Sequence, residues 1–266
     1  MRSATQGNAL LAVLQADRKV VIVGLLAITA LAWLYTAYLG NSMSGSGSME
    51  MGQKMAGPIT ASWSLADFAA TLMMWVVMMV AMMVPTAAPM VLTFTSMIRR
   101  KSQSGSTSVP TAIFVTGYIV IWSGFALGAT LIQWGLHEAT LMSPMMVTTN
   151  TVLGSALLIG AGAYQLSPLK LTCLNKCRSP LGFLMNEWRE GHRGTLSMGL
   201  VHGAYCVGCC WVLMALLFVL GVMNLLWIAV LSAFVLLEKV VPAGQWLSRA
   251  SGILLIAWGA WLPFVT

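Results

Sequence analysis

Long apolar segments separated by short polar stretches run along most of the 266-residue chain. A helix needs about 20 consecutive apolar residues to cross the hydrocarbon core of a bilayer. Because such segments recur along the sequence, the pattern predicts an all-α, polytopic helical membrane protein with about seven transmembrane helices. We expect these helices at residues 20–39, 65–98, 110–136, 147–166, 195–220, 224–241 and 246–264.

The composition agrees with this class of protein. Charged residues make up only 8% of the chain, and the mean hydropathy is +0.83, whereas a soluble domain carries about 25% charged residues. No repeat or second domain is visible, so we expect a single integral membrane domain over residues 1–266. It would include a flexible Gly/Ser/Met outer loop at about 40–62 and an inner, cysteine-containing loop at about 167–194.

The positions of lysine and arginine predict the orientation. With the N-terminus inside, all fourteen of these residues except Lys54 fall on the inner side of the expected helices. The positive-inside rule therefore predicts an N-in, C-out protein of the bacterial inner (cytoplasmic) membrane. The net charge of +7 then faces anionic lipid of the inner leaflet. Because the basic residues are scattered without interleaved aromatic residues, the sequence argues against a nucleic-acid partner.

The apolar stretch VHGAYCVGCCW (201–211) contains His202, Cys206, Cys209 and Cys210. On a helix these four side chains fall within an arc of about 100°. Gly199 and Gly203 lie on the same face and would admit a close neighbouring helix. Ionisable residues inside membranes tend to be functional, so this face predicts the wall of a metal site. The alternative is that these residues only pack, since a free cysteine behaves as a small apolar side chain.

Two further groups extend this hypothesis on the inner side. Cys173 and Cys177, in KLTCLNKCRSP, are four residues apart and would face the same way on a helical turn. Nearby lysines and arginines would favour their thiolates. Glu238 lies at about the depth of His202 and could orient its imidazole from the second shell. Its alternative role is a pair with Lys239 or Arg249.

Methionine is concentrated in the second expected helix and in the outer loop. In the helix, Met78 and Met82 form one i, i+4 pair, and Met79 and Met83 form another. Thioethers bind soft ions such as Cu(I), although methionine also fills gaps in helix packing. The Gly/Ser-rich loop would capture Cu(I) with exposed thioethers from Met43, Met49, Met51 and Met55.

Four segments of the chain resemble a known bacterial family. These are MMWVVMMVAMMVPTAAPM, CLNKCRSPLGF, GAYCVGCCWVLM and LEKVVPAG, which are similar to the family catalogued as domain of unknown function 2182. Its members are described as predicted metal-binding integral membrane proteins. The resemblance runs from about the second to the last expected helix and implies metal binding, without a substrate or a reaction.

The leading hypothesis is a membrane protein that binds Cu(I), with zinc as the second choice, for transport, handling or delivery to a partner. That partner would be a metallochaperone or a membrane complex. One alternative is a membrane thiol-disulfide oxidoreductase using the C-x-x-C of the fifth expected helix. Another is an accessory subunit of a larger membrane complex. The chain carries no phosphate-binding loop, Ser/His/Asp set or paired carboxylates, so the sequence favours a protein that is not an enzyme.

Overall fold

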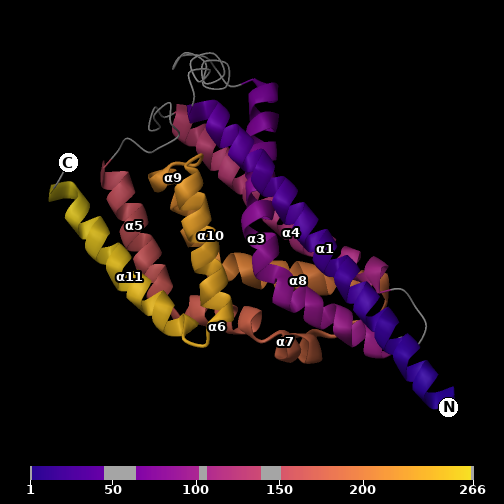
Figure 1. Ribbon diagram of the computed structural model, residues 1–266. Helices are drawn as coiled ribbons and strands as arrows, with labels where there is room; N and C mark the ends of the chain where they lie inside the picture. The colour runs from indigo at the N-terminus through magenta and orange to yellow at the C-terminus, as the bar shows by residue number, and fades with distance from the viewer. Residues whose placement is uncertain (1, 45–63, 102–106, 139–150, 265–266) are drawn as a thin grey trace.

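The computed structural model describes residues 2–44, 64–101, 107–138 and 151–264 (Figure 1). These residues form α-helices and one short 3-10 helix, and no strand occurs among them, which confirms the all-α prediction. The elements are α1 (Arg2–Ser44), α3 (Leu65–Lys101), α4 (Ser108–Glu138), α5 (Thr151–Leu166), α6 (Pro168–Arg178), α7 (Pro180–Glu187), α8 (Gly191–Ala215), α9 (Leu217–Leu220), α10 (Leu225–Val240), α11 (Gly244–Trp261) and η1 (Leu262–Phe264).

The number of helices able to cross a membrane is smaller than expected. Within the described ranges, five are long and apolar enough: Lys19–Asn41, Leu65–Arg100, Ser108–Glu138, Gly191–Leu220 and Gly244–Phe264. A sixth span exists only if α5 and α6, which are bent by 62°, act as one. With 16 residues, α10 is about 24 Å long, short of a core of about 30 Å. The expectation of seven spans is therefore corrected to five or six.

The bend between α5 and α6 follows from two adjacent residues. Pro168 has no backbone N–H to continue α5, and it occupies the first turn of α6 instead. Ser167 caps the new helix, because its hydroxyl accepts a hydrogen bond from the backbone N–H of Lys170 at 3.2 Å. Pro180 begins α7 in the same way. The expected inner loop at 167–194 is consequently mostly helical, and its cysteines lie on α6.

The outer methionine loop cannot be compared with the structure in the same way. Met49, Met51 and Met55 lie outside the described residues. Met43 belongs to the last turn of α1, and its side chain is likewise outside the description. Capture of copper by these four residues stays a prediction.

Two prolines do not interrupt α3. Pro85 and Pro89 lie within a helix that runs unbroken from Leu65 to Lys101. A proline removes the hydrogen bond to the carbonyl four residues earlier, so Pro85 leaves that of Ala81 free. The indole N–H of Trp33, on α1, donates to this carbonyl at 3.0 Å. The contact ties α1 to α3 and satisfies a buried acceptor that would otherwise be costly.

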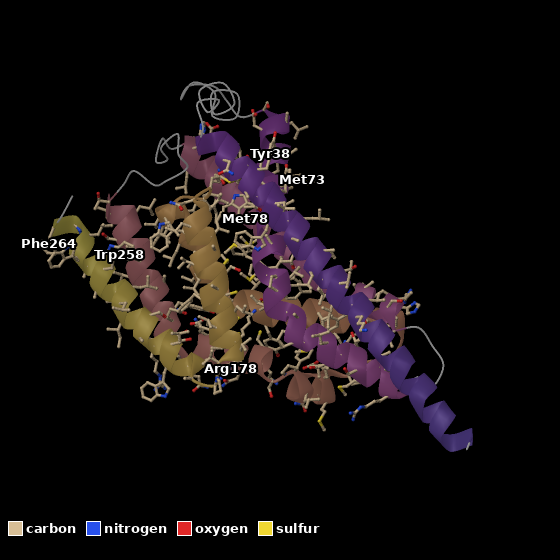
Figure 2. The ribbon with its side chains drawn as sticks, in the orientation of Figure 1. Tyr38, Met73, Met78, Arg178, Trp258 and Phe264 are labelled. Carbon is tan, nitrogen blue, oxygen red and sulfur yellow. The ribbon has the colours of Figure 1, made fainter. Side chains whose placement is uncertain are left out.

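The apolar core centres on α3. Its side chains Trp75, Met78, Met79, Met82 and Met83 are all at most 1% exposed. By contrast, Met73 is 60% exposed, on the outer side of the same helix, as Figure 2 shows beside Met78. The methionine-rich face of α3 thus points into the bundle.

Glycines bring α4 and α8 close together. A Cβ atom on Gly199 would lie 2.2 Å from the carbonyl oxygen of Phe114, and one on Gly117 would lie 2.6 Å from that of Leu196. Only residues without a side chain allow this approach, as in other close crossings of membrane helices. The crossing positions Tyr118 of α4 against Cys206 of α8.

We predict that Gly199→Ala destabilises the protein, because the added methyl group must force α8 away from Phe114. The expected loss is about 1–3 kcal/mol, as for other overpacked sites. Gly124→Ala on α4 is the control, since nothing lies within 4 Å of its added Cβ, and it should gain about 0.5–1 kcal/mol in helix propensity. Thermal unfolding in detergent measures both. Equal melting temperatures for the two variants would contradict this account of the crossing.

Candidate metal centre

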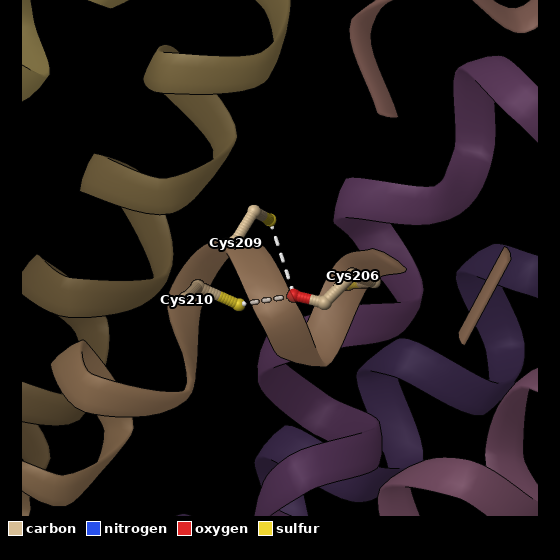
Figure 3. A group of neighbouring side chains, drawn as sticks. All are labelled: Cys206, Cys209 and Cys210. Atoms are coloured by element: carbon tan, nitrogen blue, oxygen red, sulfur yellow. Dashed lines mark hydrogen bonds between the residues drawn. The ribbon is translucent and has the colours of Figure 1, made fainter. Parts of the chain in front are cut away.

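Three cysteines on α8 form a compact, buried group of sulfur atoms. The sulfurs of Cys206, Cys209 and Cys210 all lie within 4.8 Å of one another, and each residue is at most 2% exposed. Figure 3 shows them on neighbouring turns of α8. The thiols of Cys209 and Cys210 donate to the carbonyl oxygen of Cys206, at 3.1 and 3.0 Å. We call these three residues the cysteine triad.

The triad has suitable dimensions for a soft metal ion. Metal–thiolate bonds are about 2.3 Å long, so three sulfurs around one ion lie about 4 Å apart. The spacing i, i+3, i+4 is what puts three side chains on one helical face. Small rotations of the side chains would therefore let the triad hold an ion.

A buried lysine contacts the triad. Lys239, on α10, donates from Nζ to the sulfur of Cys206 at 3.0 Å and to the hydroxyl of Thr86 at 2.9 Å. The phenol oxygen of Tyr118 lies 3.0 Å from the same sulfur and donates to the carbonyl of Met83 at 3.0 Å. An ammonium group buried in apolar protein is costly without an anionic partner. The arrangement therefore favours negative charge on the sulfur of Cys206.

Sequence reasoning missed the role of Lys239, along with those of Tyr118 and Thr86. It considered Lys239 only as a partner for Glu238. The available signal was the lysine itself, because a charged side chain inside an apolar helix usually has a specific partner. Which helix supplies that partner is a matter of tertiary packing.

Helix α6 brings the two remaining cysteines to the same region. The Cys177 side chain is buried, and its thiol interacts with the thiols of Cys206 and Cys209. Cys173 is half-buried beside Gly208, where an added Cβ would come within 2.9 Å of its sulfur. All five cysteines are free thiols. The structure thus places the expected inner pair next to the triad, with Cys177 nearer to it.

His202 lies one helical turn before the triad and outside it. The imidazole is 2% exposed and packs against the rings of Phe114, Tyr118 and Phe183, with ring centroids 6.0, 5.7 and 5.5 Å away. Its Nδ1 atom is buried and has no hydrogen-bond partner among the described residues. The sequence hypothesis put His202 on one site wall with Cys206, Cys209 and Cys210, whereas the compact group consists of the three cysteines without it.

The expectation that Glu238 orients His202, or pairs with Lys239 or Arg249, is wrong. Its carboxylate accepts from Lys170 Nζ at 2.7 and 2.9 Å and from the Ser248 hydroxyl at 2.7 Å. Successive residues of a helix point about 100° apart. Glu238 therefore faces α6 and α11, while its neighbour Lys239 faces α3 and α8.

The four methionines of α3 that the sequence hypothesis singled out are all buried, and one of them contacts the triad. The sulfur of Met83 lies 4.0 Å from that of Cys210, which makes Met83 a neighbour of the triad. Met78, Met79 and Met82 belong to the same buried core. The carbonyl of Met82 also accepts a hydrogen bond from Ser232 of α10, at 3.2 Å.

The fold and this cluster define a class of protein: a helical protein with several helices of membrane-spanning length and a buried cysteine triad able to hold a metal ion. Residues 72–262 match the PpoB2 family, whose members are described as copper chaperones. The chain belongs to that family, and the match covers the helices that form the cysteine triad and its surroundings, from α3 to α11. We found no match among curated proteins or among solved structures. Family and triad together indicate copper-related metal handling.

The buried ion pair beside the cluster gives a stability prediction. Lys170→Met removes the cation and leaves the Glu238 charge buried without its partner, which should cost about 3–5 kcal/mol. Replacing both residues, as Lys170→Met with Glu238→Leu, removes both charges and should recover most of that loss. Denaturant unfolding of the purified protein measures the two effects. A single variant as stable as the wild type would show that the pair does not hold α6 against α10.

Proposed function

We propose that this protein is an integral membrane chaperone for Cu(I), which binds the ion at the cysteine triad and delivers it to a partner. The observation that supports this most strongly is the triad itself: three sulfurs within 4.8 Å of one another, in a chain of the copper chaperone family. Copper is the cargo in this proposal, and the partner is a metallochaperone or a membrane-complex protein that accepts it.

The donor atoms favour Cu(I) over other ions. Thiolates and thioethers are soft ligands that select Cu(I), and the triad with the neighbouring Met83 consists of sulfur alone. Zinc is the second candidate. Structural zinc sites are four-coordinate, so zinc would need Cys177 as a fourth ligand.

The charge of Lys239 also suits a monovalent ion. With two cysteines of the triad as thiolates and the third as a thiol, the ammonium and Cu(I) bring the net charge to zero, which is the cheapest state inside an apolar bundle. Lys239 lies against Cys206 at 3.0 Å and is positioned to supply the ammonium. In this role it compensates the charge of the site without binding the ion.

We also propose that the protein lies in the bacterial inner membrane with its N-terminus inside. The support is the length of five or six apolar helices and the basic residues at the inner ends of the first two, which are Arg18 and Lys19 before the first span and Arg99, Arg100 and Lys101 after the second. Arg178 lies on that side, where it donates to the backbone carbonyls of Val241 and Pro242 at 2.7 Å each, and Figure 2 shows it at the lower end of the bundle.

Burial argues against the oxidoreductase alternative. Thiol-disulfide exchange requires a second sulfur to approach the attacked one along an open path. Cys206 and Cys209 are 0% and 2% exposed, so the cysteine of a partner protein does not reach them. Their position in the middle of α8 also lacks the helix N-terminus that acidifies redox-active cysteines.

The test is the copper content of cysteine variants purified in detergent after Cu(I) loading. We expect about one copper per wild-type chain and a large loss in Cys206→Ala, Cys209→Ala and Cys210→Ala, because soft thiolate ligands hold the ion. As packing changes alone, these substitutions should cost only about 1 kcal/mol. Cys173→Ala is the matched control, since Cys173 lies outside the triad, and it should keep its copper.

Other results would contradict the proposal in distinct ways. Full copper occupancy in all three triad variants would reduce the cysteines to packing residues. Stoichiometric zinc in place of copper would show that zinc, and not copper, is the cargo. A reversible disulfide without bound metal would favour the oxidoreductase, and neither metal nor disulfide would favour the accessory subunit.

A further inference from the structure

A pocket of about 350 Å³ lies where α3 ends and where α4 and α8 begin. Phe94 and Ile98 of α3, Pro110 of α4, and His192 and Met198 of α8 contribute to its lining. Arg189 and Glu190 add charged groups. The pocket therefore combines a polar part with an apolar part, and the apolar part includes a methionine. We call it the α8 pocket.

Soft ligands lead from this pocket to the cysteine triad along one face of α8. Met198, His202, Cys206 and Cys210 follow at intervals of four residues. Residues four apart lie one turn apart on the same face, about 6 Å along the axis. Met198 is 1% exposed and His202 is 2% exposed, so both are enclosed by protein.

His202 carries an unused ligand atom on this line. Its Nδ1 is buried without a hydrogen-bond partner among the described residues, which is unfavourable for a polar atom. The neighbouring rings of Phe114, Tyr118 and Phe183 offer only their faces or edges to it. Such faces do stabilise a passing cation. The atom is thus placed to coordinate an ion that moves through.

We propose that the α8 pocket is the port through which Cu(I) is exchanged with the cysteine triad, and that Met198 and His202 form a transit site between them. The inference rests on the proposed function and adds the route to it. With the orientation proposed above, the port opens toward the cytoplasmic side.

The transfer is a sequence of ligand exchanges in which copper stays Cu(I). The bond to the Met198 thioether breaks as a bond to His202 Nδ1 forms, and that bond breaks as one to the Cys206 sulfur forms. No electron moves. The anionic thiolates of the triad bind Cu(I) more strongly than a neutral thioether or a neutral imidazole does, which draws the ion inward. Delivery to a partner runs through the same ligands in reverse, because the partner binds Cu(I) more strongly than the triad does.

The experiment compares loading rate with equilibrium occupancy in the full-length protein in detergent. Cu(I) is supplied as its bicinchoninate chelate, and stopped-flow absorbance follows its transfer. We expect Met198→Leu and His202→Phe to bind about one copper at equilibrium, as the wild type does, but to load about tenfold more slowly, since each tenfold is about 1.4 kcal/mol of barrier. Met214→Leu is the matched control, because Met214 is equally buried on α8 but lies beyond Cys210 from the pocket. It should load at the wild-type rate.

The outcomes separate the route from the function. Wild-type loading rates in both Met198→Leu and His202→Phe would overturn the route and leave the chaperone proposal standing. Loss of equilibrium copper from His202→Phe would also overturn it, because His202 would then belong to the stable site. A wild-type protein that binds no Cu(I) would overturn the proposed function itself. Should His202→Phe fail to fold, the conservative Met198→Leu decides alone.

Discussion

The contact between Lys239 and Cys206 is the interaction around which the bundle is arranged. It places an ammonium group 3.0 Å from a sulfur atom deep in an apolar interior, where an unpaired charge would cost several kcal/mol. Four helices contribute to it, because Thr86 of α3 and Tyr118 of α4 complete the contacts made by α10 and α8. Losing any of these partners leaves a charge or a polar group without compensation. In the proposed function, the same contact prepares the Cys206 thiolate for a metal ion.

Two features bring Lys239 and Cys206 together: a hydrogen bond to the backbone carbonyl that Pro85 leaves free, and a close crossing of α4 and α8. Trp33 of α1 binds the carbonyl that Pro85 frees, so α3 stays helical through the level of Thr86 and Met83. Gly199 and Gly203 let α8 approach α4 until Tyr118 reaches Cys206. On the opposite side of α10, Glu238 holds Lys170 at 2.7 Å and so fixes α6 with its cysteines. Glu238 and Lys239, which are adjacent residues of α10, thereby anchor α6 and α8, the two helices that carry the cysteines.

The sequence was sufficient for features that depend on periodicity and ligand type. It predicted the all-α class, the course of most helices, and three cysteines on one face of residues 195–220. The sequence did not predict the features that depend on tertiary contacts. The i, i+4 spacing of Cys173 and Cys177 does not reveal that the Pro168 bend turns α6 back toward α8. Likewise, Glu238 and Lys239 are neighbours in sequence, but the helix directs them to different partners, Lys170 and Cys206. The sequence also predicted a membrane span at residues 224–241, whereas α10 has only 16 residues and is shorter than a full span.

In the proposed function, sulfur atoms of the cysteine triad hold copper in the reduced state. X-ray absorption spectroscopy of the purified protein, loaded with one equivalent of Cu(I), tests it most directly. We expect the edge of Cu(I) and a first shell of sulfur only, at about 2.3 Å, the length of metal–thiolate bonds. A first shell dominated by nitrogen or oxygen would contradict the account, because the copper would then be bound elsewhere.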